Sequence, residues 1–353
     1  MSRFLNRMYD GLKPYTPGEQ PKNFKKLIKL NTNENPYEPA LGVIRVINDG
    51  ELRKLNLYSD PETADLIKEI GKFYGIDKNK IMAGNGSDEI LAFIFMAFQS
   101  ESRKIYYPEI SYSFYPVYCD VFGACGVKVP LGEDFVINPA DYYNADGTIV
   151  ITNPNAPTGR ALSLEEIESI LEKNKDNLVV IDEAYVDFGA ESAVRLIDEY
   201  DNLLVVQTFS KSRSLAGARI GFAAGNEEII GDLNRIKFSF NPYNLNRLSI
   251  LAGIEAIKDV DYFKTTCKKI EDEREKFAAE MKALGFKVIP SKANFIFISH
   301  PDMSGEDYFT KLRKYNIIVR HFNNEKIRDY VRITIGTPEE MAALVDATKK
   351  ILG

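Results

Sequence analysis

Between about residues 80 and 225, short apolar runs alternate with longer amphipathic segments, and this alternation restricts the fold more than any other feature. Four runs are rich in Val and Ile: 105–107, 148–152, 178–181 and 203–206. Apolar runs of this length are typical of strands that are covered on both faces in a parallel sheet. Strand, helix and strand in succession predict an α/β fold, with a mainly parallel sheet flanked by helices.

Helix boundaries can be predicted from capping residues. Ser163, followed three residues later by Glu166, forms a capping box at the start of one helix between two of the strands. Thr337 and Glu340 repeat this pattern before the last helix.

After about residue 245 the pattern changes to a long amphipathic helix over 261–284 and short alternating stretches such as "NFIFI" and "YVRITIG". These features predict a second, smaller α+β lobe, as expected for 353 residues, which exceed the usual size of one hydrophobic core. The expected division is an N-terminal arm (1–30), a large domain (31–245) and a small domain (246–353).

Composition excludes several classes of function. A net charge of -6 argues against a nucleic-acid partner, and no apolar run approaches the roughly 18 residues of a membrane helix. Only two histidines are present, which disfavours zinc sites and Ser-His-Asp catalysis, and no metal is expected. Three scattered cysteines and a start without an apolar signal core favour a reducing cytoplasm.

Polar side chains follow the predicted strands, at the edge where parallel α/β sheets bind ligands. The stretches that supply them are "NLVVIDEAY", "NLLVVQTFSK", "GTIVITNPNAPTG" and the helix-opening turn "AGNGSDEI". Arg219 follows eight residues after Lys211 in "TFSKSRSLAGARIGF". Together they supply an amine, a carboxylate, a phenol, an arginine and free backbone N–H groups at a helix start.

Pyridoxal phosphate requires such a set. Its aldehyde needs a lysine, and its ring nitrogen needs a carboxylate. Its phosphate needs backbone N–H groups and an arginine. Tyr112 in "ISYSFY" offers an aromatic side chain to stack on the ring. Each feature alone has a simpler explanation: Lys211 as a surface charge, Asp182 as a strand-end cap, Tyr112 as a core residue. A nucleotide-binding α/β protein therefore stays an alternative at this point.

The stretch around Lys211 resembles the lysine motif of fold-type I pyridoxal-phosphate aminotransferases of class I/II. "NPNAPTG", "DEAYVDF" and "GNGSDE" are similar to other motifs of that family, in the same order, and the resemblance covers nearly the whole chain. The segments "LKPYTPGE", "LNTNENPYEP", "LYSDPE", "NPYNLNRLS", "SKANFIFI" and "VRITIGTPEE" resemble its histidinol-phosphate aminotransferase branch.

The resemblance implies a role for each matching residue. Lys211 would form the internal aldimine and move the proton between Cα and C4′. Asp182 would pair with the ring nitrogen, Tyr185 would bond the ring hydroxyl oxygen, and Tyr112 would stack on the ring. The cofactor phosphate would be surrounded by Ser87, Asp88, Thr208, Ser210 and Arg219.

Other implied contacts concern the substrate and a second subunit. Arg332, Arg320 and Tyr15 resemble residues that bind the anion of the small-molecule substrates, an amino acid or oxo acid and an imidazole phosphate. Tyr58 resembles a tyrosine that reaches the cofactor phosphate of the neighbouring subunit, which implies a homodimer.

One position departs from the family pattern. The family has an asparagine directly before "PTG", but this chain has Ala156 there. Either the turn shifts so that Asn155 contacts the ring oxygen, or Tyr185 contacts it alone; Asn155 is the expected contact.

The resemblance implies transamination between L-histidinol phosphate and 2-oxoglutarate, a step of histidine biosynthesis. Three alternatives stay open: an aminotransferase for aromatic or other amino acids, a phosphothreonine-type decarboxylase, and a non-catalytic regulator on the same fold. Retention of Lys211, Asp182, Tyr185 and Arg219 together argues against the regulator.

Overall fold

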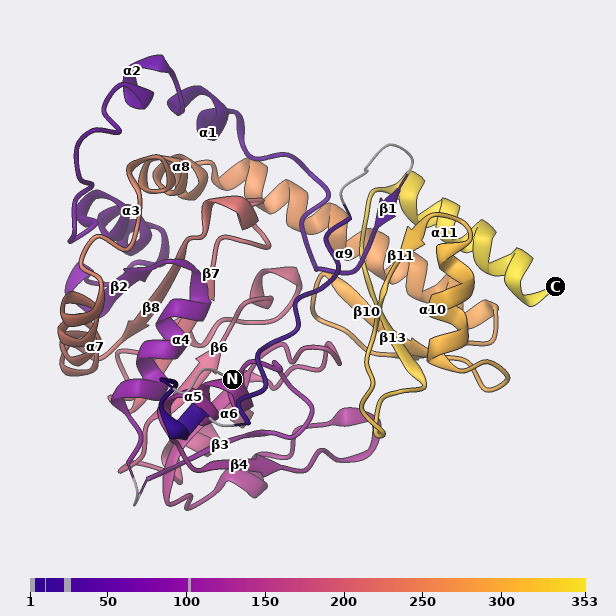
Figure 1. Cartoon of the computed structure of the whole chain (residues 1–353), viewed down its shortest axis with the longest axis horizontal. Helices are drawn as coiled ribbons and strands as arrows, with labels where there is room; N and C mark the ends of the chain where they lie inside the picture. The colour runs from indigo at the N-terminus through magenta and orange to yellow at the C-terminus, as the bar shows by residue number, and fades with distance from the viewer. Residues whose placement is uncertain (1–3, 10, 22–26, 101–102) are drawn as a thin grey trace.

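The protein is described by a computed structural model that covers residues 4–9, 11–21, 27–100 and 103–353 (Figure 1). Its largest sheet has seven strands in the order β2-β8-β7-β6-β5-β3-β4. Only β8 runs opposite to its neighbours β2 and β7; the other pairings in this sheet are parallel, which confirms the predicted fold class. The strands are β2 (Ile81–Gly84), β3 (Lys104–Pro108), β4 (Gly126–Val129), β5 (Gly147–Thr152), β6 (Val179–Asp182), β7 (Leu203–Thr208) and β8 (Gly221–Gly225).

Helices cover both faces of this sheet, because its apolar strands alternate between two cores. On β5, Ile149 and Ile151 belong to the core that includes residues of α3, α6 and α8, whereas Val150 belongs to the core that includes residues of α4, α5 and α7. The helices that flank or adjoin the sheet are α1 (Leu41–Val46), α2 (Asp49–Leu52), α3 (Ala64–Tyr74), α4 (Gly86–Ala97), α5 (Tyr115–Phe122), α6 (Leu164–Glu172), α7 (Glu227–Phe240) and α8 (Arg247–Lys258).

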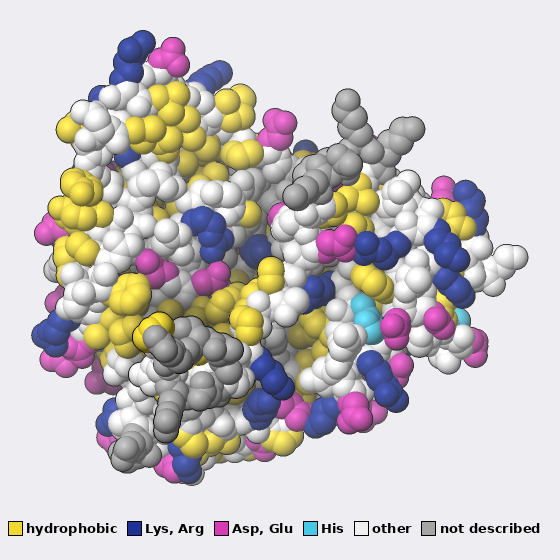
Figure 2. Space-filling model, viewed as in Figure 1, with side chains coloured by type: hydrophobic (Ala, Val, Ile, Leu, Met, Phe, Trp, Pro, Cys, Tyr) yellow, Lys and Arg dark blue, Asp and Glu magenta, His cyan; other side chains and the backbone are white. Residues whose placement is uncertain are grey.

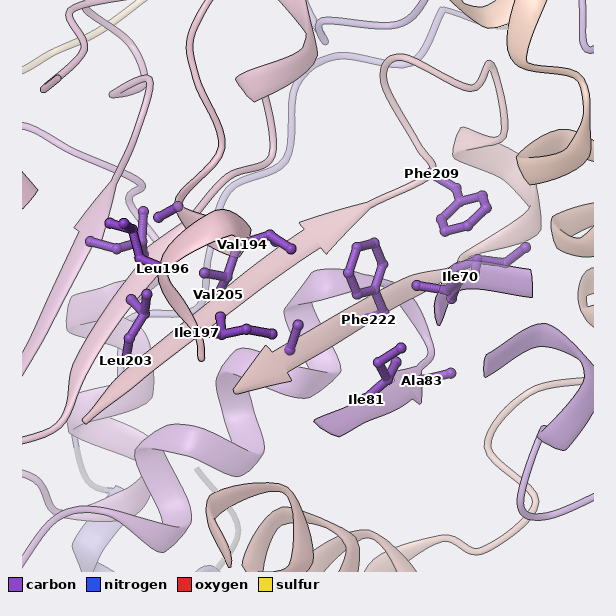
Figure 3. Packing of buried hydrophobic residues seen from close by; sticks show 14 of the residues in the cluster. Ile70, Ile81, Ala83, Val194, Leu196, Ile197, Leu203, Val205, Phe209 and Phe222 are labelled. Atoms are coloured by element: carbon purple, nitrogen blue, oxygen red, sulfur yellow. The ribbon is translucent and has the colours of Figure 1, made fainter. Parts of the chain in front are cut away.

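The loop after β7 is anchored by one of these cores. Phe209 is 1% exposed and lies edge-on to Phe222 of β8, with ring centroids 6.4 Å apart (Figure 3). Burying a phenylalanine side chain contributes about 1.5–3 kcal/mol. The anchor therefore fixes the backbone two residues before Lys211.

A second, antiparallel sheet lies in the C-terminal part of the chain, in the order β12-β13-β10-β9 (Figure 1). The two-residue strands β1 and β11 pair in parallel beside it. The elements of this part are β1 (Ile28–Lys29), α9 (Val260–Ala283), β9 (Lys287–Ile289), β10 (Phe295–Ser299), α10 (Gly305–Arg313), β11 (Ile317–Ile318), β12 (Arg320–His321), β13 (Tyr330–Thr334) and α11 (Pro338–Leu352).

Both predicted capping boxes are present: Ser163 and Glu166 begin α6, and Thr337 and Glu340 begin α11. The division into an arm and two domains stays a prediction, and residues 1–3, 10 and 22–26 of the arm lie outside the described residues. Helix α8, assigned from sequence to the small domain, packs against α1 and α3 beside the large sheet. Among the described residues, none of the helices has the length and apolar character of a membrane span.

Candidate active site

The strands of the large sheet bring their polar ends to one cavity. β5 ends at Thr152, β6 at Asp182 and β7 at Thr208, and all three run in the same direction. β8 runs the opposite way, so its first residue, Gly221, lies at the same edge. The chain therefore turns back between Lys211 and Arg219, and both residues line the cavity.

The cavity has a volume of about 160 Å³ and is lined by twelve of the fourteen predicted site residues. These are Tyr15, Ser87, Asp88, Tyr112, Asp182, Tyr185, Thr208, Ser210, Lys211, Arg219, Arg320 and Arg332. The structure thus brings together residues from the arm, the large sheet and the C-terminal sheet. The chemical role assigned to each of them stays a prediction.

Lys211 is half-buried, and its Nζ donates a hydrogen bond to the carbonyl oxygen of Thr32 at 3.2 Å. Burial lowers the pKa of the Lys211 amine to about 8, and the nearby Arg332 guanidinium adds to this effect. Its loop is held by Asn35, whose Nδ2 donates to the Lys211 carbonyl oxygen at 3.0 Å. A lysine with a pKa this close to neutrality can act both as a nucleophile and as a base.

Asp182 is 2% exposed, and burial raises the pKa of its carboxyl group to about 6. Oδ2 accepts a hydrogen bond from the Tyr115 hydroxyl at 2.8 Å, and Oδ1 accepts one from the Ala184 N–H at 3.3 Å. Both donors favour the charged form and partly offset the effect of burial. The carboxylate is therefore suited to pair with a protonated ring nitrogen.

The start of α4 has the groups that an anion cradle requires. Within the described structure, the side chain of the N-cap residue Asn85 does not cap the helix, so the first-turn N–H groups are left for a ligand. Gly86 has φ +75°, and a Cβ there would lie 2.6 Å from Nη2 of Arg219, so only glycine allows the guanidinium this close. The cradle is completed by hydroxyl groups of Ser87, Thr208 and Ser210.

Asp88 has a position that the sequence did not indicate. One carboxylate oxygen accepts from Arg219 Nη2 at 3.0 Å, and the other accepts from the Tyr112 hydroxyl at 2.7 Å. The acid thus orients both the cationic member of the cradle and the aromatic ring predicted to stack on the cofactor.

Two arginines of the C-terminal sheet also line the cavity. Arg320 and Arg332 are directly opposite each other on β12 and β13, an arrangement of like charges that is unfavourable without an anion. Arg332 Nη2 donates to the Asn31 carbonyl oxygen at 3.0 Å, but its buried Nε has no partner among the described residues. An unpaired buried donor beside a second cation favours binding of a carboxylate or phosphate. Tyr15, stacked on Phe114, lines the same cavity.

Asn155 and Tyr58 are not among the residues that line the cavity. Asn155 is fully buried, and its Nδ2 donates to Ile110 O at 2.9 Å and to Thr158 Oγ1 at 3.0 Å. The neighbouring residue Ala156 lines the cavity. The contact of Asn155 with the ring oxygen stays a prediction. Tyr58 is 80% exposed and stacks on Tyr243, and its role toward a neighbouring subunit also stays a prediction.

Two residues of functional interest were not identified from the sequence. Asn33, in "LNTNENPYEP", donates from Nδ2 to the Tyr185 hydroxyl oxygen at 3.0 Å, which leaves the Tyr185 proton available to a ligand. Tyr115, only three residues after Tyr112, contacts Asp182. The aromatic cluster "SYSFY" contains both Tyr112 and Tyr115. The sequence alone allowed a role to be assigned only to Tyr112, because the role of Tyr115 depends on its tertiary contact with Asp182.

Comparison with known proteins agrees with this geometry. Residues 25–347 match the sequence model of the family described as aminotransferase class I and II. The chain belongs to this family. One relative is histidinol-phosphate aminotransferase of Brachyspira hyodysenteriae, which is 55% identical over 100% of this chain and 99% of its own length.

Two solved structures share the fold. Histidinol-phosphate aminotransferase from Sinorhizobium meliloti, solved in complex with pyridoxal-5'-phosphate, superposes with a TM-score of 0.87 at 22% identity, over 100% of this chain and 98% of that one. L-threonine-O-3-phosphate decarboxylase from Porphyromonas gingivalis gives a TM-score of 0.81 at 24% identity, over 92% and 99% of the two chains. Because both enzymes have this fold, the fold alone does not determine the reaction.

Proposed function

We propose that this chain is a pyridoxal-phosphate-dependent aminotransferase that exchanges an amino group between L-histidinol phosphate and 2-oxoglutarate. The observation that carries the reaction class is the convergence of Lys211, Asp182 and Arg219 on one cavity of an aminotransferase-family fold. The substrate follows from the 55% identity, over the full length, to an enzyme that bears the name of this reaction.

The residues present fit the cofactor. When bound, pyridoxal phosphate supplies an aldehyde that combines with amines and a protonated ring that withdraws electrons from the reacting carbon. Arg219 and the start of α4 would hold its phosphate, and Asp182 would keep its ring nitrogen protonated. Asn33 donates a hydrogen bond to the Tyr185 hydroxyl oxygen, which leaves the Tyr185 proton free to bond the hydroxyl oxygen of the cofactor ring. Tyr185 would make this bond although Ala156 has no side chain that could donate a second one.

Lys211 would carry the proton transfer. Its free amine would take the proton from the substrate Cα and deliver it to C4′ of the cofactor, and it would move a proton in the opposite direction in the second half of the reaction. Because its pKa is lowered to about 8, the amine is partly neutral near pH 7 to 8. Glutamate and histidinol phosphate differ in size but each carries an anion, which the Arg320–Arg332 pair would bind.

A homodimer would complete the site. Figure 2 shows hydrophobic side chains gathered over α1 and α2. Leu41, Ile44, Leu55 and Leu57 are each more than half exposed, and Tyr58 adjoins them. An apolar surface of this kind is typical of an interface, and a second copy seated on it would let Tyr58 approach the partner's cradle. We also propose a cytoplasmic location, in keeping with three free cysteines in the described chain.

The test is an assay of the purified protein loaded with pyridoxal phosphate. L-Histidinol phosphate and 2-oxoglutarate should yield glutamate, whereas aromatic amino acids should react at least about tenfold more slowly as judged by kcat/KM. O-Phospho-L-threonine should release no carbon dioxide. Lys211→Ala should lose the visible absorption band that depends on the covalent link between lysine and cofactor, and several orders of magnitude of turnover.

Three results would contradict the proposal. Preference for an aromatic amine donor would assign the chain to a different aminotransferase, and carbon dioxide release would assign it to the decarboxylases. Normal turnover by Lys211→Ala would refute the role of the amine itself.

A further inference from the structure

Tyr115 connects two strand ends whose last residues line the cavity. It is the first residue of α5, its side chain is fully buried, and its hydroxyl lies 2.8 Å from Asp182 Oδ2 and 2.7 Å from Thr152 Oγ1. Thr152 and Asp182 are direct neighbours in the register of β5 and β6. One phenol therefore bridges the ends of two adjacent strands.

The hydrogen-bond directions follow from the donors available. A phenol has one proton, and an ionised carboxylate can only accept, so Tyr115 donates to Asp182. Thr152 then donates to the Tyr115 oxygen, which gives a chain from Thr152 through Tyr115 to Asp182. Within the described structure, the Ala184 N–H at 3.3 Å is the other donor to this carboxylate, so the Tyr115 hydroxyl is the closer of the two.

The ring that carries this hydroxyl is held on several sides. Phe95 stacks on it with centroids 5.8 Å apart, and the Tyr107 ring meets it edge-on at the same separation. Tyr112 lies at 89° to it, with centroids 5.7 Å apart. The same ring thus supports both the carboxylate and the aromatic residue predicted to stack on the cofactor.

We propose that Tyr115 is a positioning residue that keeps the Asp182 carboxylate ionised and directed toward the ring nitrogen of the cofactor. The proposal rests on the proposed function for its consequence in catalysis, but its electrostatic part concerns Asp182 alone. The proposal thus gives a function to Tyr115, a fully buried residue that is not one of the three residues (Lys211, Asp182 and Arg219) on which the proposed function rests.

A purely structural role for the Tyr115 hydroxyl is the alternative, and the chain offers a matched control for it. Tyr308 is also buried, at 2% exposure, and its hydroxyl also lies 2.7 Å from a buried threonine oxygen, that of Thr348. Tyr308 is not among the residues that line the cavity, and its pair includes no carboxylate. Tyr115→Phe and Tyr308→Phe therefore remove equivalent hydroxyl groups in different electrostatic settings.

The first measurement uses the cofactor-free protein. Carbon-13 NMR of aspartate carboxyl groups, with the Asp182 signal assigned by Asp182→Asn, gives the pKa of this carboxyl directly. Loss of a hydrogen bond to a charged group should raise it by about one pH unit or more in Tyr115→Phe. The charge of Asp88 also raises the pKa of Asp182, but Asp88 is present in both variants. Tyr308→Phe should therefore leave the pKa of Asp182 unchanged.

The second measurement uses the loaded enzyme and its best amine donor. Tyr115→Phe should lower kcat about 10- to 100-fold with less than about a threefold change in KM, because a hydrogen bond to a charged group is lost while the substrate contacts stay. Tyr308→Phe should stay within about twofold of the parent. If histidinol phosphate proves to be the wrong donor, the NMR result still decides the role of Tyr115.

An unchanged Asp182 pKa in a folded Tyr115→Phe protein would overturn the proposal, as would equal losses of kcat in the two tyrosine variants. Should Tyr115→Phe fail to fold, Thr152→Val removes only the donor behind the phenol. It should raise the Asp182 pKa in the same direction by a smaller amount, because coupled hydrogen bonds strengthen one another. No rise in that variant would equally overturn the proposal.

Discussion

At the scale of single residues, burial gives ordinary side chains the properties of a reactive site. The Lys211 amine and the Asp182 carboxyl have pKa values shifted toward neutrality, to about 8 and about 6, for the same main reason. Each group lies where water is scarce, and the charged form of each is disfavoured. A cavity that contains both can exchange protons near physiological pH.

The lowered pKa of Lys211 predicts how the cofactor-free protein captures pyridoxal phosphate. Only the neutral amine attacks an aldehyde, so the rate should rise about tenfold per pH unit below the midpoint and level off above about pH 8. Stopped-flow absorbance gives this profile. Arg332→Gln should move the midpoint upward, because the Arg332 charge helps to keep it low. A midpoint near the ordinary lysine value of 10.5 would contradict the prediction.

At the scale of secondary structure, the site depends on how elements begin and end. Helix α4 starts at the edge where β5, β6 and β7 stop, and the reversed strand β8 brings Arg219 to that helix start. Gly86 is the contact point between them, since a side chain at its positive φ would collide with the guanidinium.

Gly86→Ala should therefore weaken binding of the phosphate group. Displacing Arg219 removes a charge-assisted hydrogen bond, which corresponds to about a 10- to 100-fold loss of affinity for pyridoxal phosphate. Affinity for pyridoxal, which lacks the phosphate, should change much less. Gly217→Ala is the control, because a Cβ there meets nothing within 4 Å. Equal losses for both ligands, measured by fluorescence titration, would show that Gly86 matters only for folding.

At the scale of the whole molecule, the cavity joins segments that are far apart in the sequence. Asn33 and Thr334 are hydrogen-bonded across 301 positions, and Arg332 reaches the backbone of Asn31. The substrate side of the site is thus built by the N-terminal segment and the C-terminal sheet together. If a second copy covers α1 and α2, the two cavities of a dimer would also depend on each other.

This dependence predicts the effect of breaking the proposed interface. A lysine at each of two exposed apolar positions, Ile44→Lys with Leu55→Lys, should convert a dimer to monomers in analytical ultracentrifugation, because burying unpaired charges in an interface is costly. The monomers should retain pyridoxal phosphate less well, since Tyr58 of the second copy is lost. Leu352→Lys, at an exposed position of α11, should change neither property. A parent protein that sediments as a monomer would refute the dimer.

The sequence by itself determined the elements and the chemistry of their ends. Val- and Ile-rich runs predicted β3, β5, β6 and β7, and capping boxes predicted the starts of α6 and α11, because these signals are local. Strand-end positions likewise predicted that Asp182 and Lys211 would lie at one edge. Local signals suffice for properties that depend on neighbouring residues.

Only the tertiary structure decided which residues line the cavity and which do not. Asn155 and Ala156 are adjacent in sequence. The side-chain amide of Asn155 nevertheless donates hydrogen bonds to Ile110 and Thr158, whereas Ala156 lines the cavity. Tyr112 and Tyr115 differ by three positions, yet only the second reaches Asp182. The physical reason is that a side chain's direction is set by packing between elements distant in sequence, here β3, α5 and the ends of β5 and β6.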